Sequence, residues 1–194
     1  MKVGVLALQG DFEAHARVLD RLGVEWAYIR RAEELRGVDA LILPGGESTT
    51  SLKFLEGDGF REAIRRLPAQ GKPLFGTCAG AILLAQEVAG LPQPGLGLVD
   101  VAIERNAYGR QLDSAVRSGW CALKQGELEM VFIRAPRIRR VGPQVEVLGE
   151  CEGEPVLVQQ GNCLLATFHP ELTDDTTIHR HFLELVRMRQ TEKV

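Results

Sequence analysis

The chain has 194 residues, enough for one sizeable hydrophobic core and too few for two. With 45% hydrophobic and 25% charged residues it has the composition of a soluble globular protein, and a net charge of -3 argues against a nucleic-acid-binding surface. Residues 1–8 are too short an apolar run for a signal peptide and no run reaches the length of a membrane span, so we expect a cytoplasmic protein.

The first half of the sequence alternates between strand and helix patterns. Apolar runs bounded by turn residues predict strands at residues 3–8, 24–29, 40–43 and 72–75. Helices are predicted after Asp11, after a cap formed by Ser48, Thr49 and Thr50, and at 60–69 and 81–85. Strands that are apolar throughout are typical of parallel sheets covered by helices on both faces.

After residue 98 the pattern changes to short alternating strands, predicted at residues 98–103, 128–133, 145–148, 156–159 and 163–168. Tight links containing Gly or Pro separate several of them, which indicates antiparallel additions to the sheet. A closing helix places Ile178, Phe182, Leu185 and Val186 on one face. No linker or repeat interrupts the chain, so we expect residues 1–194 to form a single α/β domain.

The sequence contains four cysteines: Cys78, Cys121, Cys151 and Cys163. They are too far apart for a CxxC metal or redox pair, and a reducing cytosol argues against disulfides. The last three lie in strand-like stretches and are interpreted as small buried hydrophobic residues. Cys78 lies where a strand gives way to a helix, between Gly76 and Gly80, a pattern that resembles a nucleophile elbow. The helix N-terminus there would favour the reactive thiolate.

A nucleophilic thiol needs a base, and the base needs an orienting group. Three of the four histidines lie in predicted helices, where an exposed or structural role is expected: His15, His179 and His181. His169 instead follows a strand and begins the sequence His169-Pro170-Glu171. Because Pro170 keeps His169 extended, side chains 169 and 171 are expected to face the same side, so that Glu171 orients the imidazole. Alone the tripeptide is more often a chance turn; with an elbow cysteine upstream, the catalytic interpretation is favoured.

Attack on a carbonyl also needs donors for the oxyanion. The Ala79 N–H at the start of the elbow helix is one candidate, and the Gly46 N–H, after the strand at 40–43, is the other. The Pro44-Gly45-Gly46 segment is equally interpretable as a tight turn, and the two interpretations are compatible. Residues 44–48 lack the Gly-Lys-Ser/Thr of a phosphate loop and residues 9–10 lack GxGxxG, which argues against a nucleotide site.

The elbow, the Pro-Gly-Gly segment and the His-Pro-Glu segment together resemble the triad-type (class I) glutamine amidotransferases. Longer segments narrow the resemblance to the glutaminase subunits of pyridoxal 5'-phosphate synthase: LALQGDF at 6–12, GGEST at 45–49, ERNAYGRQLDS at 104–114, FIRAP at 132–136 and TFHPELT at 167–173. The similarity extends from Val3 to about Leu185. After Asp113-Ser114 this family leads us to expect an aromatic residue and an acid, but Ala115-Val116 follow, which puts the local packing in doubt.

The resemblance implies a three-layer, flavodoxin-like α/β fold with a mixed sheet. It implies that Cys78 is the nucleophile, His169 the base and Glu171 its orienting partner, with Gly46 and Ala79 forming the oxyanion hole. It also implies a glutamine site formed by Gly46, Glu47, Ser48, Arg105, Ile133 and Arg134. Capture of an amino acid that carries both charges calls for a cation, an acid and backbone polar groups. Without this pattern, Arg105 and Arg134 would be interpreted as ordinary surface arginines.

The implied reaction is hydrolysis of L-glutamine to glutamate and ammonia, with no metal or organic cofactor. The implied partner is a separate (β/α)8-barrel synthase subunit, in a large hetero-oligomer, that consumes the ammonia. Gln9, after the first strand, is a candidate for coupling to that partner, and a polar residue that merely ends a strand is about as good an interpretation. Three arginines are interpreted as a solvated or partner-facing cluster: Arg137, Arg139 and Arg140.

Two alternatives remain open. One is the glutaminase subunit of another synthase, such as imidazole glycerol phosphate synthase, against which the RNAYGRQ and FIRAP segments argue. The other is a non-catalytic relative that keeps an elbow cysteine, against which the intact His169-Pro170-Glu171 argues.

Overall fold

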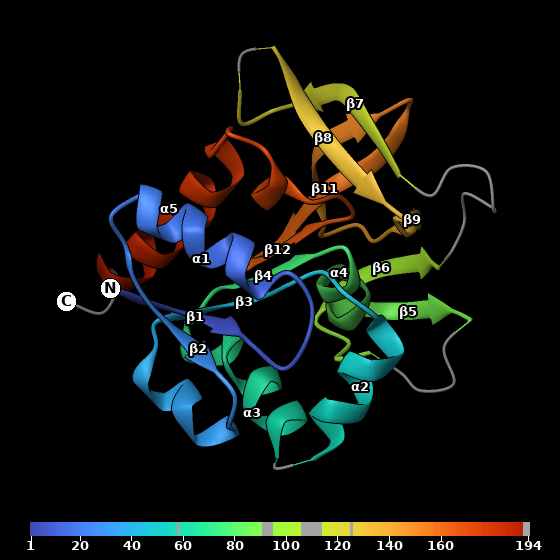
Figure 1. Cartoon of the computed structure of the whole chain (residues 1–194). Helices are drawn as coiled ribbons and strands as arrows, with labels where there is room; N and C mark the ends of the chain where they lie inside the picture. The colour runs from blue at the N-terminus through green and yellow to red at the C-terminus, as the bar shows by residue number, and fades with distance from the viewer. Residues whose placement is uncertain (58, 91–94, 106–113, 125, 192–194) are drawn as a thin grey trace.

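The computed structural model describes residues 1–57, 59–90, 95–105, 114–124 and 126–191 (Figure 1). Nine strands form the larger of two sheets: β1 (Lys2–Leu6), β2 (Glu25–Ile29), β3 (Ala40–Leu43), β4 (Leu74–Thr77), β7 (Ser114–Cys121), β8 (Glu127–Ile133), β10 (Glu146–Cys151), β11 (Glu154–Gln160) and β12 (Cys163–Ala166). Their spatial order is β2-β1-β3-β4-β12-β11-β10-β7-β8. The sheet thus joins strands from both halves of the chain; that residues 1–194 form one domain stays a prediction.

The larger sheet is parallel from β2 to β12 and antiparallel from β12 to β8. This confirms the expected mixed sheet with antiparallel additions in the second half of the chain. The strand predicted at 163–168 as one of those antiparallel additions has a different position. It forms β12, which lies in the middle of the sheet, parallel to β4 and antiparallel to β11. Its apolar sequence, buried at all four residues, suits that central position.

Helices cover the parallel part of the sheet on both faces, as Figure 1 shows. On one face lie α1 (Phe12–Arg21) and α5 (Thr177–Thr191), and on the other lie α2 (Ser48–Glu56), α3 (Phe60–Arg66) and α4 (Ala79–Leu84). The strands divide their side chains between the two cores with a period of two. In β3, for example, Ala40 and Ile42 join the core beneath α1 and α5, and Leu41 and Leu43 join the other. The three-layer α/β fold is confirmed.

Short 3-10 helices complete this frame: η1 (Ala32–Gly37), η2 (Pro68–Gln70) and η3 (Pro170–Leu172). The predicted helix at 60–69 therefore ends early, as α3 followed by η2. Predicted strand boundaries agree with the structure to within three residues, but β7 was recognised only around Cys121. Within the described residues, no helix combines the length and apolar character needed to cross a membrane.

The second sheet contains β5 (Ala85–Ala89), β6 (Val99–Glu104) and β9 (Arg137–Val141), in the order β5-β6-β9. The helix expected at 81–85 is present as α4, which ends at Leu84, and β5 begins at the next residue. One expectation was wrong here, because the strand expected at 98–103 pairs in this small sheet instead of the large one.

The predicted arginine cluster forms part of β9. Arg139 contacts Glu104 at 2.6 Å, and Arg140 contacts Asp100 at 2.8 Å and Glu87 at 3.0 Å. These exposed cations therefore pair across the strands of their own sheet. Residues 106–113, which carry most of the RNAYGRQ segment, lie outside the described residues. The departure at Ala115-Val116 falls in β7, where Val116 is 64% exposed.

Candidate active site

Cys78 lies in a strained turn between β4 and α4. Its backbone has a φ of 49°, uncommon for a residue with a side chain, and its N–H donates to the Ala166 carbonyl on β12 at 2.8 Å. A Cβ added at Gly76 would lie 2.5 Å from the carbonyl oxygen of Gly80, and one added at Gly80 would overlap the carbonyl oxygen of Leu43. The strand, the turn and the helix can approach this closely only because both positions are glycine. Cys78 thus occupies the tip of an elbow.

The other three cysteines lie inside strands, as predicted. All four are described, and all four are free thiols. Cys121, Cys151 and Cys163 are each at most 6% exposed. Burial raises the pKa of these three thiols, that of Cys163 to about 12. A thiol that stays protonated at neutral pH is a poor nucleophile, so none of the three competes with Cys78.

His169 is held beside Glu171 in the core. Its backbone N–H donates to the Val131 carbonyl at 2.8 Å, and its Nδ1 lies 2.7 Å from Oε1 of Glu171. The pairing is as expected, but the extended chain proposed for it was wrong. Pro170 begins the 3-10 turn η3, which carries the Glu171 carboxylate back to the ring.

The electrostatic surroundings favour charge on both members of this pair. Burial by itself would lower the pKa of His169, but the neighbouring Cys78 thiol and Glu171 carboxylate raise it to about 10. Burial by itself would raise the pKa of Glu171, but His15 and His169 together hold it below its ordinary value. At neutral pH the site therefore favours an imidazolium between a sulfur and a carboxylate.

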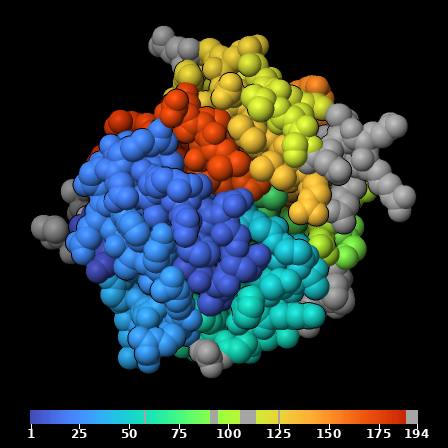
Figure 2. Space-filling model, viewed as in Figure 1, coloured from blue at the N-terminus to red at the C-terminus, as the bar shows by residue number. Residues whose placement is uncertain are grey.

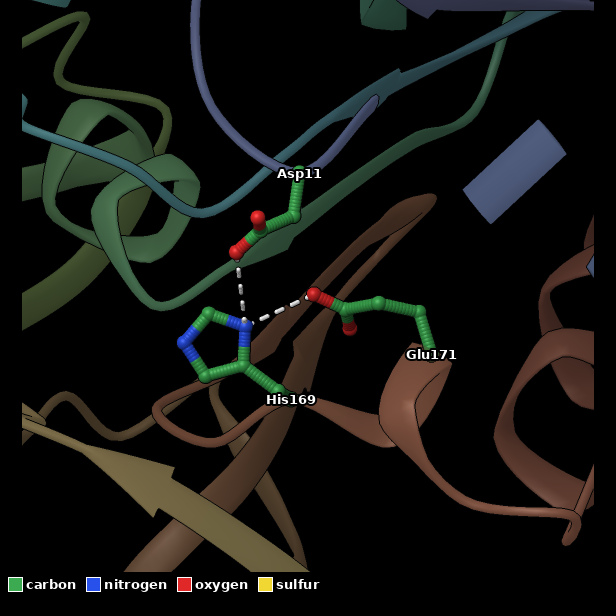
Figure 3. A group of neighbouring side chains, drawn as sticks. All are labelled: Asp11, His169 and Glu171. Carbon is green, nitrogen blue, oxygen red and sulfur yellow. Dashed lines mark hydrogen bonds and ion pairs between the residues drawn. The ribbon is translucent and has the colours of Figure 1, made fainter. Parts of the chain in front are cut away.

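Asp11 is a second carboxylic acid near His169, and the sequence indicated it only as a helix cap. Its Oδ2 lies 3.8 Å from Nδ1 of His169, the same ring nitrogen that Glu171 approaches, as Figure 3 shows, and its side chain is half-exposed. Asp11, His169 and Glu171 offer ligand atoms within 4.8 Å of one another, a spacing that a metal ion could bridge. Because Nδ1 and Oε1 are already in contact at 2.7 Å, we interpret the group as an oriented imidazole, and the absence of a metal stays a prediction.

The loop after β3 is fixed to the loop after β1. The Gly45 carbonyl accepts from the Asp11 N–H at 3.1 Å, and Gly46 has a φ of 152°. The Gln9 side-chain amide makes two hydrogen bonds to the backbone of Glu47: its Oε1 accepts from the Glu47 N–H and its Nε2 donates to the Glu47 carbonyl, each at 3.1 Å. The same Nε2 also donates to Oγ of Ser51. Gln9 therefore holds the loop that carries the predicted oxyanion donor.

These segments surround one cavity of about 300 Å³. Its lining includes most of the residues implied by the sequence: Gly46, Glu47, Ser48, Cys78, Arg105, Ile133, Arg134 and His169. Asp11, Ile82 and Pro136 complete it. Figure 2 shows the N-terminal segment, the α2 region and the segment after β8 meeting on one face of the molecule. Ala79 is buried behind Cys78 as the first residue of α4.

Glu47 and Arg105 are linked at the mouth of the cavity. Glu47 is the N-cap of α2: its carboxylate accepts from the N–H groups of Thr49 at 3.0 Å and Thr50 at 2.7 Å, so the cap expected from Ser48, Thr49 and Thr50 was wrong. Burial would raise the pKa of Glu47, but these hydrogen bonds lower it to about 2. Arg105 lies 3.3 Å from the same carboxylate, and the cavity therefore holds a fixed acid beside a cation.

The SNO glutamine amidotransferase family model matches residues 5–188. The chain belongs to that family. Among its relatives is a protein of Koribacter versatilis named pyridoxal 5'-phosphate synthase subunit PdxT, 56% identical over 187 residues, with 96% of each chain covered. A Thermus thermophilus protein of the same name is 53% identical, covering 94% of this chain and 96% of that one.

Solved structures of other proteins share the fold. One, described as a glutamine amidotransferase, has a TM-score of 0.90 at 50% identity and covers 95% of this chain and 98% of its own. A more distant one, a putative GMP synthase subunit of Thermoplasma acidophilum, has a TM-score of 0.72 at 16% identity, with 100% and 98% covered, and supports the fold alone. The class I glutamine amidotransferase fold expected from the sequence is confirmed.

Two histidines that the sequence left without a chemical role lie close to the site. His15 and His179 are fully buried, as a structural role requires, and His15 lies 3.5 Å from Glu171. A signal was present, since each shares a helix face with apolar residues three and four positions later. His181 is half-buried and contacts Oε1 of Gln159 at 2.6 Å.

Proposed function

We propose that this protein hydrolyses L-glutamine to L-glutamate and ammonia through a γ-glutamyl thioester on Cys78. The observation that carries the proposal is that Cys78 and His169, whose ring is paired with the buried Glu171, line one cavity of a glutamine amidotransferase family member. A thiol at an elbow, a paired imidazole and a small polar cavity are the elements that acyl transfer to sulfur requires.

The chemistry begins with transfer of the Cys78 proton to His169, whose raised pKa favours the resulting imidazolium. The thiolate attacks the side-chain amide carbon of glutamine, and the tetrahedral intermediate collapses as His169 protonates the leaving nitrogen, which departs as ammonia. Neutral His169 then takes a proton from water, which attacks the thioester. The carbon–sulfur bond breaks, glutamate leaves and the Cys78 thiol is restored. Glu171 stays ionised throughout and keeps Nδ1 of the ring as its donor.

The oxyanion and the amino-acid end of glutamine have separate partners in this proposal. The N–H groups of Gly46 and Ala79 stabilise the oxyanion of both tetrahedral intermediates. Arg105 and Arg134 attract the α-carboxylate and Glu47 attracts the α-ammonium, with Ser48 and Ile133 completing the glutamine site. Arg134 supports this role by its position, since it lines the cavity with an exposed side chain on a strained backbone of φ 43°.

We further propose that the ammonia serves a partner. The relatives are named as subunits of pyridoxal 5'-phosphate synthase, and we infer that this chain delivers ammonia to a (β/α)8-barrel synthase subunit in a large cytoplasmic hetero-oligomer that makes pyridoxal 5'-phosphate. The relatives' names favour this synthase over the alternative, a glutaminase subunit of another amidotransferase such as imidazole glycerol phosphate synthase.

The Gly45–Gly46 peptide suits control by such a partner. The Asp11 N–H holds the Gly45 carbonyl, so the Gly46 N–H, across a trans peptide bond, points the opposite way. Turning this peptide would break one hydrogen bond, worth about 1 kcal/mol net. The glycines add little steric resistance. Gln9, which brackets Glu47, is the residue through which docking would act on this loop.

The test of the proposed reaction is glutamate release from L-glutamine by the purified chain, alone and with a barrel synthase. Cys78→Ala should abolish release, and a glutamine-analogue electrophile should label the wild-type protein once, at Cys78. Cys163→Ala is the matched control and should keep both properties. Turnover by Cys78→Ala, or labelling at Cys163, would contradict the proposal.

A further inference from the structure

A chain of buried polar contacts continues behind Glu171, on the side away from His169. Figure 3 shows the second carboxylate oxygen of Glu171 turned away from the imidazole. That oxygen, Oε2, lies 3.5 Å from Nε2 of His15 on α1, which also lies 3.0 Å from Oγ1 of Thr77 on β4. On the other side of the ring, Nδ1 of His15 lies 3.1 Å from Nε2 of His179 on α5. Four elements thus meet around one carboxylate.

The two histidines in this chain of contacts, His15 and His179, are electrically neutral. Their side chains are fully buried, and burial lowers the pKa of His15 and lowers that of His179 to about 3. The ionisable groups that influence the pKa of His15 are Glu171, His169 and Asp11, and those that influence the pKa of His179 are Glu171, His15 and Arg21. A neutral imidazole carries one N–H and one lone pair, so the direction of each hydrogen bond depends on the tautomer.

The surroundings select one tautomer for each ring. A lone pair on Nε2 of His15 would face Oε2 of Glu171, which has no hydrogen-bond partner among the described residues, whereas an N–H there is attracted to this oxygen across 3.5 Å and can donate to Oγ1 of Thr77. His15 Nδ1 is then an acceptor, so Nε2 of His179 must be the donor. The Nδ1 of His179, which has no hydrogen-bond partner among the described residues, then carries a lone pair and not a buried unsatisfied N–H.

Apolar side chains would fill these two positions without burying polar atoms, and burying polar atoms is costly unless they are hydrogen-bonded. The contacts here lead from His179 through His15 to the carboxylate that holds the proposed base. We propose that His15, fixed as its Nε2–H tautomer by His179, is a positioning residue: its N–H keeps Glu171 ionised and turned so that Oε1 accepts from Nδ1 of His169.

This inference rests on the proposed glutaminase activity, and a set of substitutions tests it at saturating partner synthase. His15→Leu removes the N–H and should lower kcat about tenfold with little change in KM for glutamine. Glu171 would lose the N–H that faces its carboxylate and favours the ionised form, so the acidic limb of kcat/KM should move to higher pH. His15→Gln, whose amide N–H can reach a similar position, should restore most of kcat. His179→Leu should change kcat in the same direction by less. His181→Leu, two residues along α5 and in contact with Gln159, is the control and should match the wild type.

Equal kcat and an unmoved acidic limb in His15→Leu, or equal losses in His15→Leu and His15→Gln, would overturn the inference. A second measurement covers the case in which a substituted chain does not fold. Nitrogen-15 NMR of the wild-type histidines should show His15 and His179 as neutral Nε2–H tautomers, and an Nδ1–H tautomer at His15 would overturn the inference. Because the NMR measurement needs no turnover, it also separates failure here from failure of the proposed function, which an inactive wild-type complex would reveal.

Discussion

Gly45 lies where the proposed catalytic pair leaves no room for a side chain. A Cβ added there would overlap Cε1 of His169 and lie 3.1 Å from Nδ1 of the same ring. The backbone of Gly45 is outside the positive-φ region, so Gly45→Ala introduces a collision without backbone strain. To regain an ordinary contact of 3.4 Å, the imidazole must move by about 1 Å, and a displacement of that size typically costs about a hundredfold in rate.

Gly45→Ala should therefore fold and lose about a hundredfold in kcat, measured as glutamate release at saturating partner. Gly37→Ala is the matched control, because a Cβ there meets nothing within 4 Å, and its kcat should equal that of the wild type. Circular dichroism and the melting temperature establish that both chains are folded. If Gly45→Ala retained kcat within threefold of the wild type, the ring would not need its observed position, and the Pro-Gly-Gly segment would be only a tight turn.

Three further outcomes are expected. Glu171→Gln should slow turnover by orders of magnitude without weakening glutamine binding, and an unchanged rate would mean that Glu171 does not orient the base. The isolated chain should be a poor glutaminase, and a barrel synthase should activate it by up to about a thousandfold if one oxyanion donor is supplied on docking. Gln9→Ala should reduce that gain. Full activity of the isolated chain would refute the proposed control of the Gly45–Gly46 peptide by the partner. The pKa of His179 is about 3 in the folded chain, against an ordinary value of 6.5. As the pH falls below 6.5, this histidine is therefore protonated in the unfolded chain but stays neutral in the folded one. The free energy of unfolding should decline below pH 6.5 by up to about 1.4 kcal/mol per pH unit. Urea unfolding at pH 7 to 4 measures this slope, which should be shallower in His179→Leu; identical slopes would contradict the assignment.

The parallel part of the fold and the elbow at Cys78 could be predicted because their signals are local. The apolar run Ala40–Leu43 predicts a strand buried on both faces of a sheet, whichever strands are its neighbours. Gly76 and Gly80 on either side of a cysteine indicate a turn in which a strand and a helix approach closely. The position of His169 beside Glu171 was also predicted, although through the wrong backbone geometry: the 3-10 turn at Pro170 brings together the same two side chains that an extended chain would have aligned.

The features that the sequence did not reveal depend on distant partners. β9 contains three arginines, and its strand conformation depends on carboxylates such as Glu104 and Asp100 of β6, more than thirty positions earlier in the sequence. Likewise, Glu47 could be recognised as the cap of α2 only from the hydrogen bonds that its carboxylate accepts. The role inferred for His15 depends on residues from three other elements, and helical periodicity could indicate its burial but not its neighbours.

The central position of β12 has a consequence for the order in which the chain folds. β4, which ends at Thr77 just before Cys78, pairs with β3 on one side and with β12 on the other, and β12 is synthesised almost ninety residues after β4. Pairing of parallel strands so far apart in sequence is intrinsically slow, and until it occurs β4 presents an open edge to other chains. The same step brings His169 to Cys78, since the residue that accepts from the Cys78 N–H is Ala166, the last residue of β12. A nascent or partly folded chain therefore has the proposed nucleophile without the proposed base, and the proposed hydrolysis of glutamine would become possible only when the sheet closes.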